Sequence, residues 1–362
     1  MIKGISIYLH EKIPVELEMY LQQVMELGFN TVFTSIHIPE SKEEEQFEAL
    51  ILLGTLVKRY GLELMVDISG ETLVKICNDH ELLKKLQSLN IDRMRFDCDY
   101  EMNHMFEAID VLGVKSVVLN ASTLNQEDIE MIVSILKERY KDKEIIACHN
   151  FYPQVETGLD IKFIEKQGGI FEDLGIPVIS FLPSLKYARG PLYQGLVTVE
   201  AHRYTSLEES TLMLRYTKGF GGILLADCYA EETELSTIVS VCDDKAMVLE
   251  LMTRENLSEV EKKILFKREH YARYDNGEQV IRMETSRSIA SVGQRVEASN
   301  CVRRSQFDLT INNENYGRYS GELQIVLKDL TQDDRVNLVG YIEERDQYKI
   351  QYIQKGRKFY LK

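Results

Sequence analysis

The stretch Ile145-Ile-Ala-Cys-His-Asn-Phe-Tyr-Pro153 decides how this chain folds. Its first four residues are apolar, as expected of a strand buried on both faces of a parallel sheet. The strand then ends in His149 and Asn150, and Glu156 follows within a few residues. In a (β/α)8 barrel the C-terminal ends of the strands carry the chemistry. The stretch therefore predicts a barrel strand that opens into a site. The alternative is a polar loop with one capping Asn.

Other apolar runs repeat this pattern along the first part of the chain and alternate with amphipathic segments, such as residues 42–60 and 125–139. Eight strand-helix units in about 240 residues is the usual size of a closed (β/α)8 barrel, or TIM barrel. An open doubly wound sheet is the alternative, but it calls for a Gly-rich phosphate loop where Leu9-His-Glu-Lys12 stands. The predicted strands are residues 4–9, 31–36, 62–69, 93–97, 116–121, 145–150, 177–182 and 222–227.

The pattern changes after residue 243. Alternating apolar and polar runs take over, with turn residues such as Asp275-Asn-Gly277 between them and one predicted helix at about 256–267. We therefore predict two domains, a barrel over residues 1–243 and a small, mostly antiparallel β domain over residues 244–362. The predicted strands of the second domain are residues 246–252, 279–284, 306–311, 322–327, 336–342 and 348–353.

Composition excludes several classes of protein. The net charge is −15 and there is no run of Lys or Arg, so neither nucleic acid nor an anionic membrane surface is an expected partner. Six scattered cysteines without a CxxC pair indicate free thiols in a reducing compartment. No signal-peptide pattern and no apolar run of membrane-spanning length is present. We expect a cytoplasmic protein, and the sequence is compatible with a homo-oligomer.

Polar side chains follow most of the predicted barrel strands. A single Asp in such a place commonly caps the next helix, but several polar ends that converge on one mouth indicate a site. Carboxylates there could form an acid/base pair, because burial raises the pKa of one and a neighbouring Arg keeps the other ionised. The strand-end candidates are His37, Asp67, Asp97, Asn120, His149, Asn150 and Asp227. The loop candidates are Tyr152, Glu156, Arg189, Glu200, His202 and Arg203.

Other chemistries have weaker support in the sequence. The seven histidines form no HxH or HxxxH pair, although His37, His149 and His202 could still converge with carboxylates to hold a metal. No GxSxG motif occurs, and Cys148 alternates to the opposite face of its strand from His149. We therefore expect carboxylate chemistry without a metal or a cofactor.

Several motifs resemble a known family. They are His149 to Pro153 with Thr157 to Leu159, Glu200 to Arg203, and Asn315 to Ile325 with Asp334 to Gly340. The chain resembles the bacterial 6-phospho-N-acetylmuramidases from its first strand to its C-terminus. This resemblance implies a TIM barrel followed by a cyclophilin-like β domain, which agrees with the two domains predicted from the pattern.

The resemblance also implies an activity: hydrolysis of the β-1,4 bond of MurNAc 6-phosphate–GlcNAc, a cytoplasmic step in recovering peptidoglycan fragments. Glycosidases commonly use two carboxyl groups, although the substrate's 2-acetamido group can also take part. We expect Asp97 and Glu200 to be the principal pair, with Asp67 and Glu156 in reserve. The alternative for Glu200 is a simple ion pair with Arg203.

A 6-phosphate needs dedicated donors in so acidic a chain, and the Arg fork binds phosphate in a bidentate manner. Arg189, Arg203 and Arg318 are the candidates, and we expect the other polar candidates to contact the sugar. Two alternatives of other classes stay open: a metal-dependent sugar-phosphate isomerase or epimerase, and a non-catalytic sugar-phosphate binding protein. The second domain is expected to be structural and to shape the substrate site.

Overall fold

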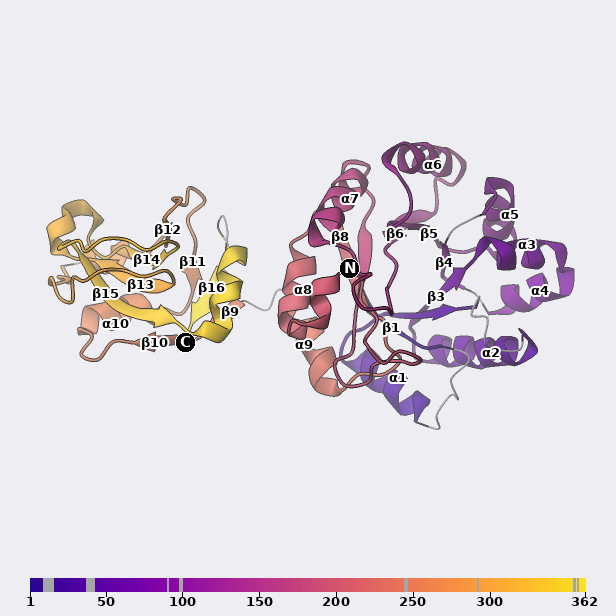
Figure 1. The fold of residues 1–362 in the computed structure, drawn as a ribbon, viewed down its shortest axis with the longest axis horizontal. Helices are drawn as coiled ribbons and strands as arrows, with labels where there is room; N and C mark the ends of the chain where they lie inside the picture. Colours follow the sequence, from indigo (N-terminus) through magenta and orange to yellow (C-terminus); the bar gives the residue numbers. More distant parts are fainter. Residues whose placement is uncertain are drawn as a thin grey trace. The chain divides into compact units, whose positions relative to one another are not determined.

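The computed structural model describes residues 1–8, 16–36, 43–89, 91–97, 100–243, 247–291, 293–353, 356 and 358–362. The chain divides into two compact units, Met1–Asp243 and Asp244–Lys362. In Figure 1 the first unit runs from indigo to orange, and the second runs from orange to yellow. The predicted site residue His37 lies outside the described residues.

The first unit is a closed barrel of eight parallel strands in sequence order, with β8 paired to β1. Each strand is short and almost continuously buried, as expected when both faces of a parallel sheet are covered. The TIM-barrel prediction is therefore confirmed, with strand boundaries shifted by up to three residues. The strands are β1 (Ile2–Ser6), β2 (Thr31–Ser35), β3 (Glu63–Ile68), β4 (Arg93–Phe96), β5 (Ser116–Asn120), β6 (Glu144–Cys148), β7 (Val178–Leu182) and β8 (Phe220–Leu225).

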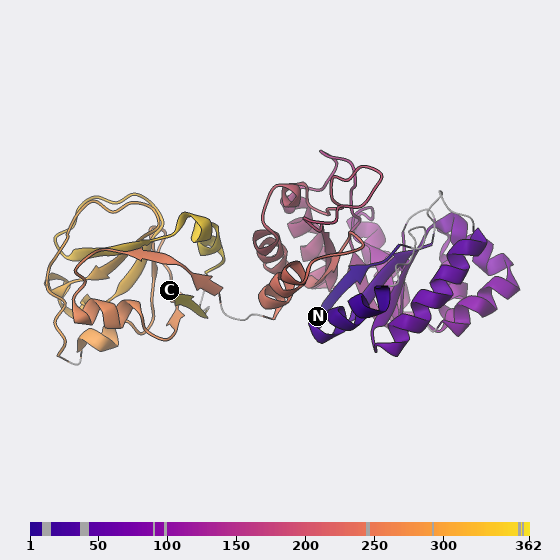
Figure 2. The same ribbon diagram turned by 90° about the horizontal axis from the view of Figure 1, so that it is seen from below.

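Helices form the outer layer of this barrel (Figures 1 and 2). Their starts follow the local sequence: the Asn125 side chain accepts a hydrogen bond from the backbone N–H of Asp128. The β3–β4 connection holds two helices instead of one. The helices are α1 (Leu17–Glu26), α2 (Glu43–Arg59), α3 (Gly70–Asn78), α4 (His80–Ser88), α5 (Met102–Leu112), α6 (Gln126–Arg139), α7 (Ile161–Asp173), α8 (Leu207–Arg215) and α9 (Glu232–Cys242).

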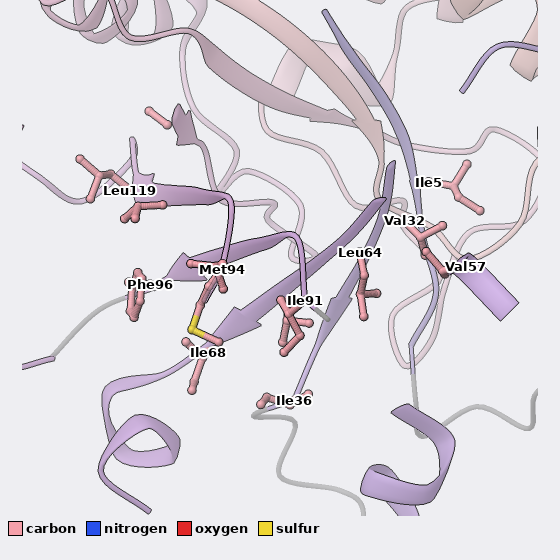
Figure 3. Packing of buried hydrophobic residues seen from close by; sticks show 14 of the residues in the cluster. Ile5, Val32, Ile36, Val57, Leu64, Ile68, Ile91, Met94, Phe96 and Leu119 are labelled. Atoms are coloured by element: carbon pink, nitrogen blue, oxygen red, sulfur yellow. The ribbon is translucent and has the colours of Figure 1, made fainter. Parts of the chain in front are cut away.

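Alternation along the strands gives this unit two apolar cores. One core lies between strands and helices, and Figure 3 shows part of it, with Leu64 and Met94 from neighbouring strands and Val57 from α2. The other fills the barrel interior and contains Phe33 and Phe181, whose rings meet edge to face at 5.1 Å. The barrel is therefore a packed core, and polar side chains can gather only at its ends.

The second unit contains a five-stranded antiparallel sheet in the order β10-β15-β13-β14-β12 and a three-stranded sheet in the order β11-β16-β9. Helix α10 (Glu259–Leu265) packs against this unit's apolar core through Val260, Ile264 and Leu265. The strands are β9 (Met247–Leu249), β10 (Leu251–Thr253), β11 (His270–Tyr271), β12 (Val280–Arg282), β13 (Asp308–Asn312), β14 (Leu323–Val326), β15 (Val336–Ile342) and β16 (Lys358–Leu361). The helical segments besides α10 are α11 (Arg287–Ser291), η2 (Glu314–Tyr319) and η3 (Glu344–Tyr352).

One predicted strand of this unit is wrong. Residues 348–353 alternate in hydropathy, but all except Ile353 belong to the 3₁₀ segment η3. The buried residues there recur every third position, since Ile350 and Ile353 both face the core and Asp346 pairs with Lys349 at 2.9 Å. That spacing suits a helical turn better than a strand.

Two further observations concern membrane-spanning helices and the cysteines. Among the helices in the described ranges, none combines the length and apolar character that a bilayer-spanning helix needs. The five cysteines that the structure describes are free thiols, and four of them are buried.

Candidate active site

A buried arginine organises the C-terminal ends of β3 and β4. Asp67 lies opposite Arg95 in the register of these two strands. The Arg95 guanidinium contacts Asp67 at 2.5 Å and Asp97 at 3.1 Å, and only 3% of its side chain is exposed. Burial alone would lower the pKa of Arg95, but the Asp67 and Asp97 carboxylates raise it above its ordinary value. Arg95 therefore stays charged and holds the two predicted carboxylates side by side.

Two asparagines extend this network to the next two strands. Asn120 Nδ2 donates to Asp97 Oδ1 at 2.9 Å and to Asn150 Oδ1 at 3.1 Å. Asn150 Oδ1 also accepts a hydrogen bond from Arg95. Asn150 Nδ2 makes no hydrogen bond within the described residues, so this amide has donors left for a ligand. Four predicted site residues, Asp67, Asp97, Asn120 and Asn150, thus meet around Arg95.

His149 supports this network from behind. It points away from the barrel interior, where Cys148 lies, and its side chain is fully buried. The Ser122 hydroxyl accepts from the backbone N–H of Asn150 at 2.9 Å, so its own proton faces His149 Nδ1 at 3.1 Å. Burial, together with the charge of Arg95, lowers the pKa of His149 to about 3. The predicted contact of His149 with substrate stays a prediction; in this structure the neutral ring is buried and reaches the backbone of Asn150 through Ser122.

Glu200 is the first residue of the 3₁₀ turn η1 (Glu200–Arg203), in the segment between β7 and α8, and it contacts the loop that follows β6. Its carboxylate accepts from the backbone N–H of Glu156 at 2.9 Å and of Gly158 at 2.7 Å, and pairs with Arg203 at 2.9 Å. Burial by itself raises the pKa of Glu200, but these three donors hold it below its ordinary value. A carboxylate bound in this way is poorly suited to donate a proton. The ion-pair alternative is the one that the structure shows.

Arg203 has no donor left for a phosphate. Its Nε donates to Glu200, and its two Nη groups donate to four backbone carbonyls. A guanidinium carries five N–H donors, so every one is used. The carbonyls belong to Tyr152 and Gln154 on one loop and to Gln194 and Gly195 on the other. The predicted phosphate contact of Arg203 is therefore corrected to a clamp between two loops.

The remaining loop candidates differ in how far the structure buries them. Glu156 has a left-handed backbone, with φ 70°, and an exposed side chain that makes no hydrogen bond or ion pair in the described part of the protein. Tyr152 is half-buried and pairs through its backbone with Val197. His202 is fully buried, and burial lowers its pKa to about 3. Glu156 and Tyr152 are thus accessible in this structure, whereas the predicted contact of His202 with substrate stays a prediction for a side chain that is fully buried here.

Asp227 shapes the loop after β7. It is almost fully buried and accepts backbone N–H groups from Ser184 at 2.9 Å, Arg189 at 2.7 Å and Leu196 at 3.4 Å. Burial raises its pKa, although these donors oppose the shift. The Arg189 guanidinium lies 3.8 Å from the centre of the Tyr8 ring. Asp227 therefore holds the backbone of Arg189 in place, and its predicted contact with substrate stays a prediction.

Arg318 belongs to the second unit, where its Nη2 donates to the Tyr319 hydroxyl at 2.7 Å. The residues that sequence reasoning missed are the supports: Arg95 as the centre, Ser122 behind Asn150, and Thr198. The Thr198 hydroxyl donates to the backbone carbonyl of Asn150 at 2.9 Å and so joins the Arg95 network to the Glu200 loop. A lone Ser or Thr carries no sequence signal of such a role. Arg95 did carry one, because it stands two residues before Asp97 and therefore shares a face of the predicted strand 93–97 with it.

The fold and this site define a class: a TIM-barrel protein with a pair of Arg-bridged carboxylates at the C-terminal ends of its strands. No set of three His, Cys, Asp or Glu side chains in the described ranges is arranged to hold a metal ion. Comparison with known families then identifies the chain more closely. Residues 3–240 match the model of the 6-phospho-N-acetylmuramidase N-terminal domain, and residues 247–362 match that of the C-terminal domain. The chain belongs to the 6-phospho-N-acetylmuramidase family.

Two solved structures are similar over the whole chain. A conserved protein of unknown function from Enterococcus faecalis is 30% identical, with a TM-score of 0.70, and the match covers 100% of this chain and 96% of that one. An uncharacterized protein from B. cereus is 25% identical, with a TM-score of 0.79, and the match covers 100% and 99% of the two chains. No match was found among curated proteins.

Proposed function

We propose that this protein is a glycoside hydrolase that cleaves the β-1,4 bond of MurNAc 6-phosphate–GlcNAc in the recovery of cell-wall fragments in the cytoplasm. The observation that carries the proposal is the match of both units to the 6-phospho-N-acetylmuramidase family. The barrel mouth supports it, because two carboxylates and two side-chain amides converge where TIM barrels hold their substrates.

Asp97 is the carboxylate that we assign to the reacting centre. Of the two acids on Arg95 it is the more accessible, with 22% of its side chain exposed against 8% for Asp67. Glycoside hydrolysis passes through an oxocarbenium-like transition state. A carboxylate fixed by Arg95 and Asn120 can stabilise that positive charge, or steer the 2-acetamido oxygen that attacks in a substrate-assisted route.

The second carboxyl group is assigned differently from the sequence-based expectation. Glu200 is bound by three donors, so we assign it a positioning role. Glu156 is the candidate proton donor, since its side chain is exposed on the loop that Glu200 holds in place. Arg189 is the phosphate candidate that the barrel offers once Arg203 is assigned to the clamp.

The purified protein should release GlcNAc and MurNAc 6-phosphate from the phosphorylated disaccharide, measured by liquid chromatography with mass detection. The unphosphorylated disaccharide is the control for phosphate recognition, and Arg189→Gln should reduce the preference for the phosphorylated form. Absence of turnover on every 6-phospho-sugar tested would refute the proposal. Loss of activity with a chelator would favour a metal-dependent isomerase or epimerase, and binding without turnover would favour a sugar-phosphate binding protein.

A further inference from the structure

The second unit has a pocket of its own, with a volume of about 490 Å³. That size falls within the range of small-molecule sites. It is lined by polar and charged side chains on two segments, the start of α11 and the end of η2. The lining residues that matter here are Glu284, Thr285, Arg287, Ser288, Arg318 and Ser320.

Two guanidinium groups of this pocket converge on one aromatic ring. The Cζ atom of Arg318 lies 4.9 Å from the centre of the Tyr319 ring, and that of Arg287 lies 5.6 Å from it. Arg287 is partly neutralised by the buried carboxylate of Glu322, at 3.6 Å. Arg318 has no carboxylate partner within the described part of the chain. The pocket therefore brings together two guanidinium groups, of which only Arg287 is paired with a carboxylate, although the chain as a whole has a net charge of −15.

Hydroxyl groups accompany these cations. The Ser320 side chain makes no hydrogen bond among the residues that the structure describes, and it lines the pocket beside Arg318. Thr285 accepts a hydrogen bond from Lys267, which brings a third cation to the rim. The only lining carboxylate in the described residues, that of Glu284, offers acceptors that suit the hydroxyl groups of a ligand. Gly317, with φ 59° and ψ −122°, turns the chain where η2 meets the pocket, a conformation that favours glycine.

We propose that this pocket binds the phosphate monoester of a sugar, independently of the barrel mouth. Arginine forks and hydroxyl donors are the groups that bind phosphate oxygens. The pocket is larger than a phosphate ion needs, and the acceptors of Glu284 suit a neighbouring group rich in hydroxyls. The proposal concerns binding alone, so it does not require the hydrolytic activity proposed for the barrel.

The absence of tryptophan from the sequence permits a local test. The Tyr316 ring meets the Tyr319 ring edge-on at 6.2 Å and does not line the pocket. Tyr316→Trp therefore places the only tryptophan of the full chain beside this pocket. The probes are glucosamine 6-phosphate, inorganic phosphate and glucosamine, which separate an ester from a free ion and from the same sugar without its phosphate.

Glucosamine 6-phosphate should change the fluorescence saturably, inorganic phosphate should bind more weakly, and glucosamine should have no effect. Arg318→Gln or Arg287→Gln in this background should weaken binding of the ester at least about tenfold, the usual effect of losing a charged hydrogen bond. Arg303→Gln is the matched control, because Arg303 is an exposed arginine outside the pocket that pairs with Asp329.

No saturable response to the ester, tighter binding of the free ion, or equal weakening by Arg303→Gln would overturn the proposal. If Tyr316→Trp does not fold, binding is measured in a protein that keeps all its tyrosines, by phosphorus NMR of glucosamine 6-phosphate. Both samples then carry Arg189→Gln, which removes the phosphate donor proposed for the barrel, and one also carries Arg318→Gln. Equal broadening of the phosphorus line in the two samples, with and without Arg318→Gln, would overturn the proposal.

Discussion

Glu200→Gln separates a catalytic carboxylate from a structural one. The substitution keeps the size of the side chain and removes its charge. The amide oxygen can still accept from Glu156 or Arg203, but the amide NH2 then faces a donor. In the native protein both carboxylate oxygens accept, Oε1 from Glu156 and Arg203 and Oε2 from Gly158. The variant should therefore destabilise the loop that begins at Tyr152.

The expected loss in the free energy of unfolding follows from these hydrogen bonds. A hydrogen bond to a charged group contributes about 1 kcal/mol more than a neutral one, and an unpaired buried N–H costs about 1–3 kcal/mol. Breaking a fully buried ion pair costs about 3–5 kcal/mol. Glu200 is 24% exposed and Arg203 only 3%, so the pair lies below that extreme. We expect the free energy of unfolding to fall by about 2–4 kcal/mol.

Urea denaturation followed by circular dichroism measures this loss, and release of GlcNAc at saturating substrate measures kcat. Where the variant is still folded, kcat should fall by less than about tenfold, well under the effect of removing an acid or base. Glu165→Gln, an exposed glutamate on α7, is the matched control and should change neither quantity. A 100-fold loss of kcat with unchanged stability would refute the reasoning and make Glu200 a catalytic acid.

Three further predictions test the site. Asp97→Asn should lower kcat by at least about 100-fold without unfolding the protein. Asp142→Asn, at an exposed position, should leave kcat unchanged, and equal rates for the two variants would remove Asp97 from the mechanism. Gly158→Ala should lower the free energy of unfolding, measured by urea denaturation, by about 1–3 kcal/mol, because a Cβ there would lie 2.6 Å from Glu200 Oε2. Gly169→Ala, with its nearest contact at 3.4 Å, is the control, and equal losses for the two variants would contradict the close approach. Burial lowers the pKa of His202 to about 3, so between pH 6.5 and 3 the unfolded chain holds a proton that the folded chain lacks, and stability falls as the pH falls. His202→Gln should shrink the stability difference between pH 7 and pH 5 by about 2 kcal/mol, and an unchanged difference would show that His202 titrates normally.

The barrel and the four polar strand ends that meet at Arg95 could be predicted because their signals are local, although Arg95 itself was not among the predicted site residues. A strand buried on both faces appears in the sequence as a continuous apolar run, and the residue after it lies at the barrel mouth regardless of the conformation of the loops. Asp67, Asp97, Asn120 and Asn150 follow that rule, and all four meet at Arg95.

The roles of the loop residues could not be predicted in this way. Glu200 and Arg203 bond to a segment 42 to 51 residues away in sequence, and only the folded loops bring these groups together. The buried position of His149 could not be predicted for a different reason. It follows an apolar strand as Asn150 does, but alternation turns its side chain toward the helices, where a neutral ring packs.

The Arg203 clamp has a consequence for motion. One guanidinium holds the carbonyls of Tyr152 and Gln154 on one side and of Gln194 and Gly195 on the other. Neither loop can therefore swing outward alone without leaving a buried cation unsolvated. The two loops should open together as one cooperative unit, and their backbone amides should share one rate of hydrogen exchange. A substrate large enough to need a wider mouth would have to displace both loops in a single event.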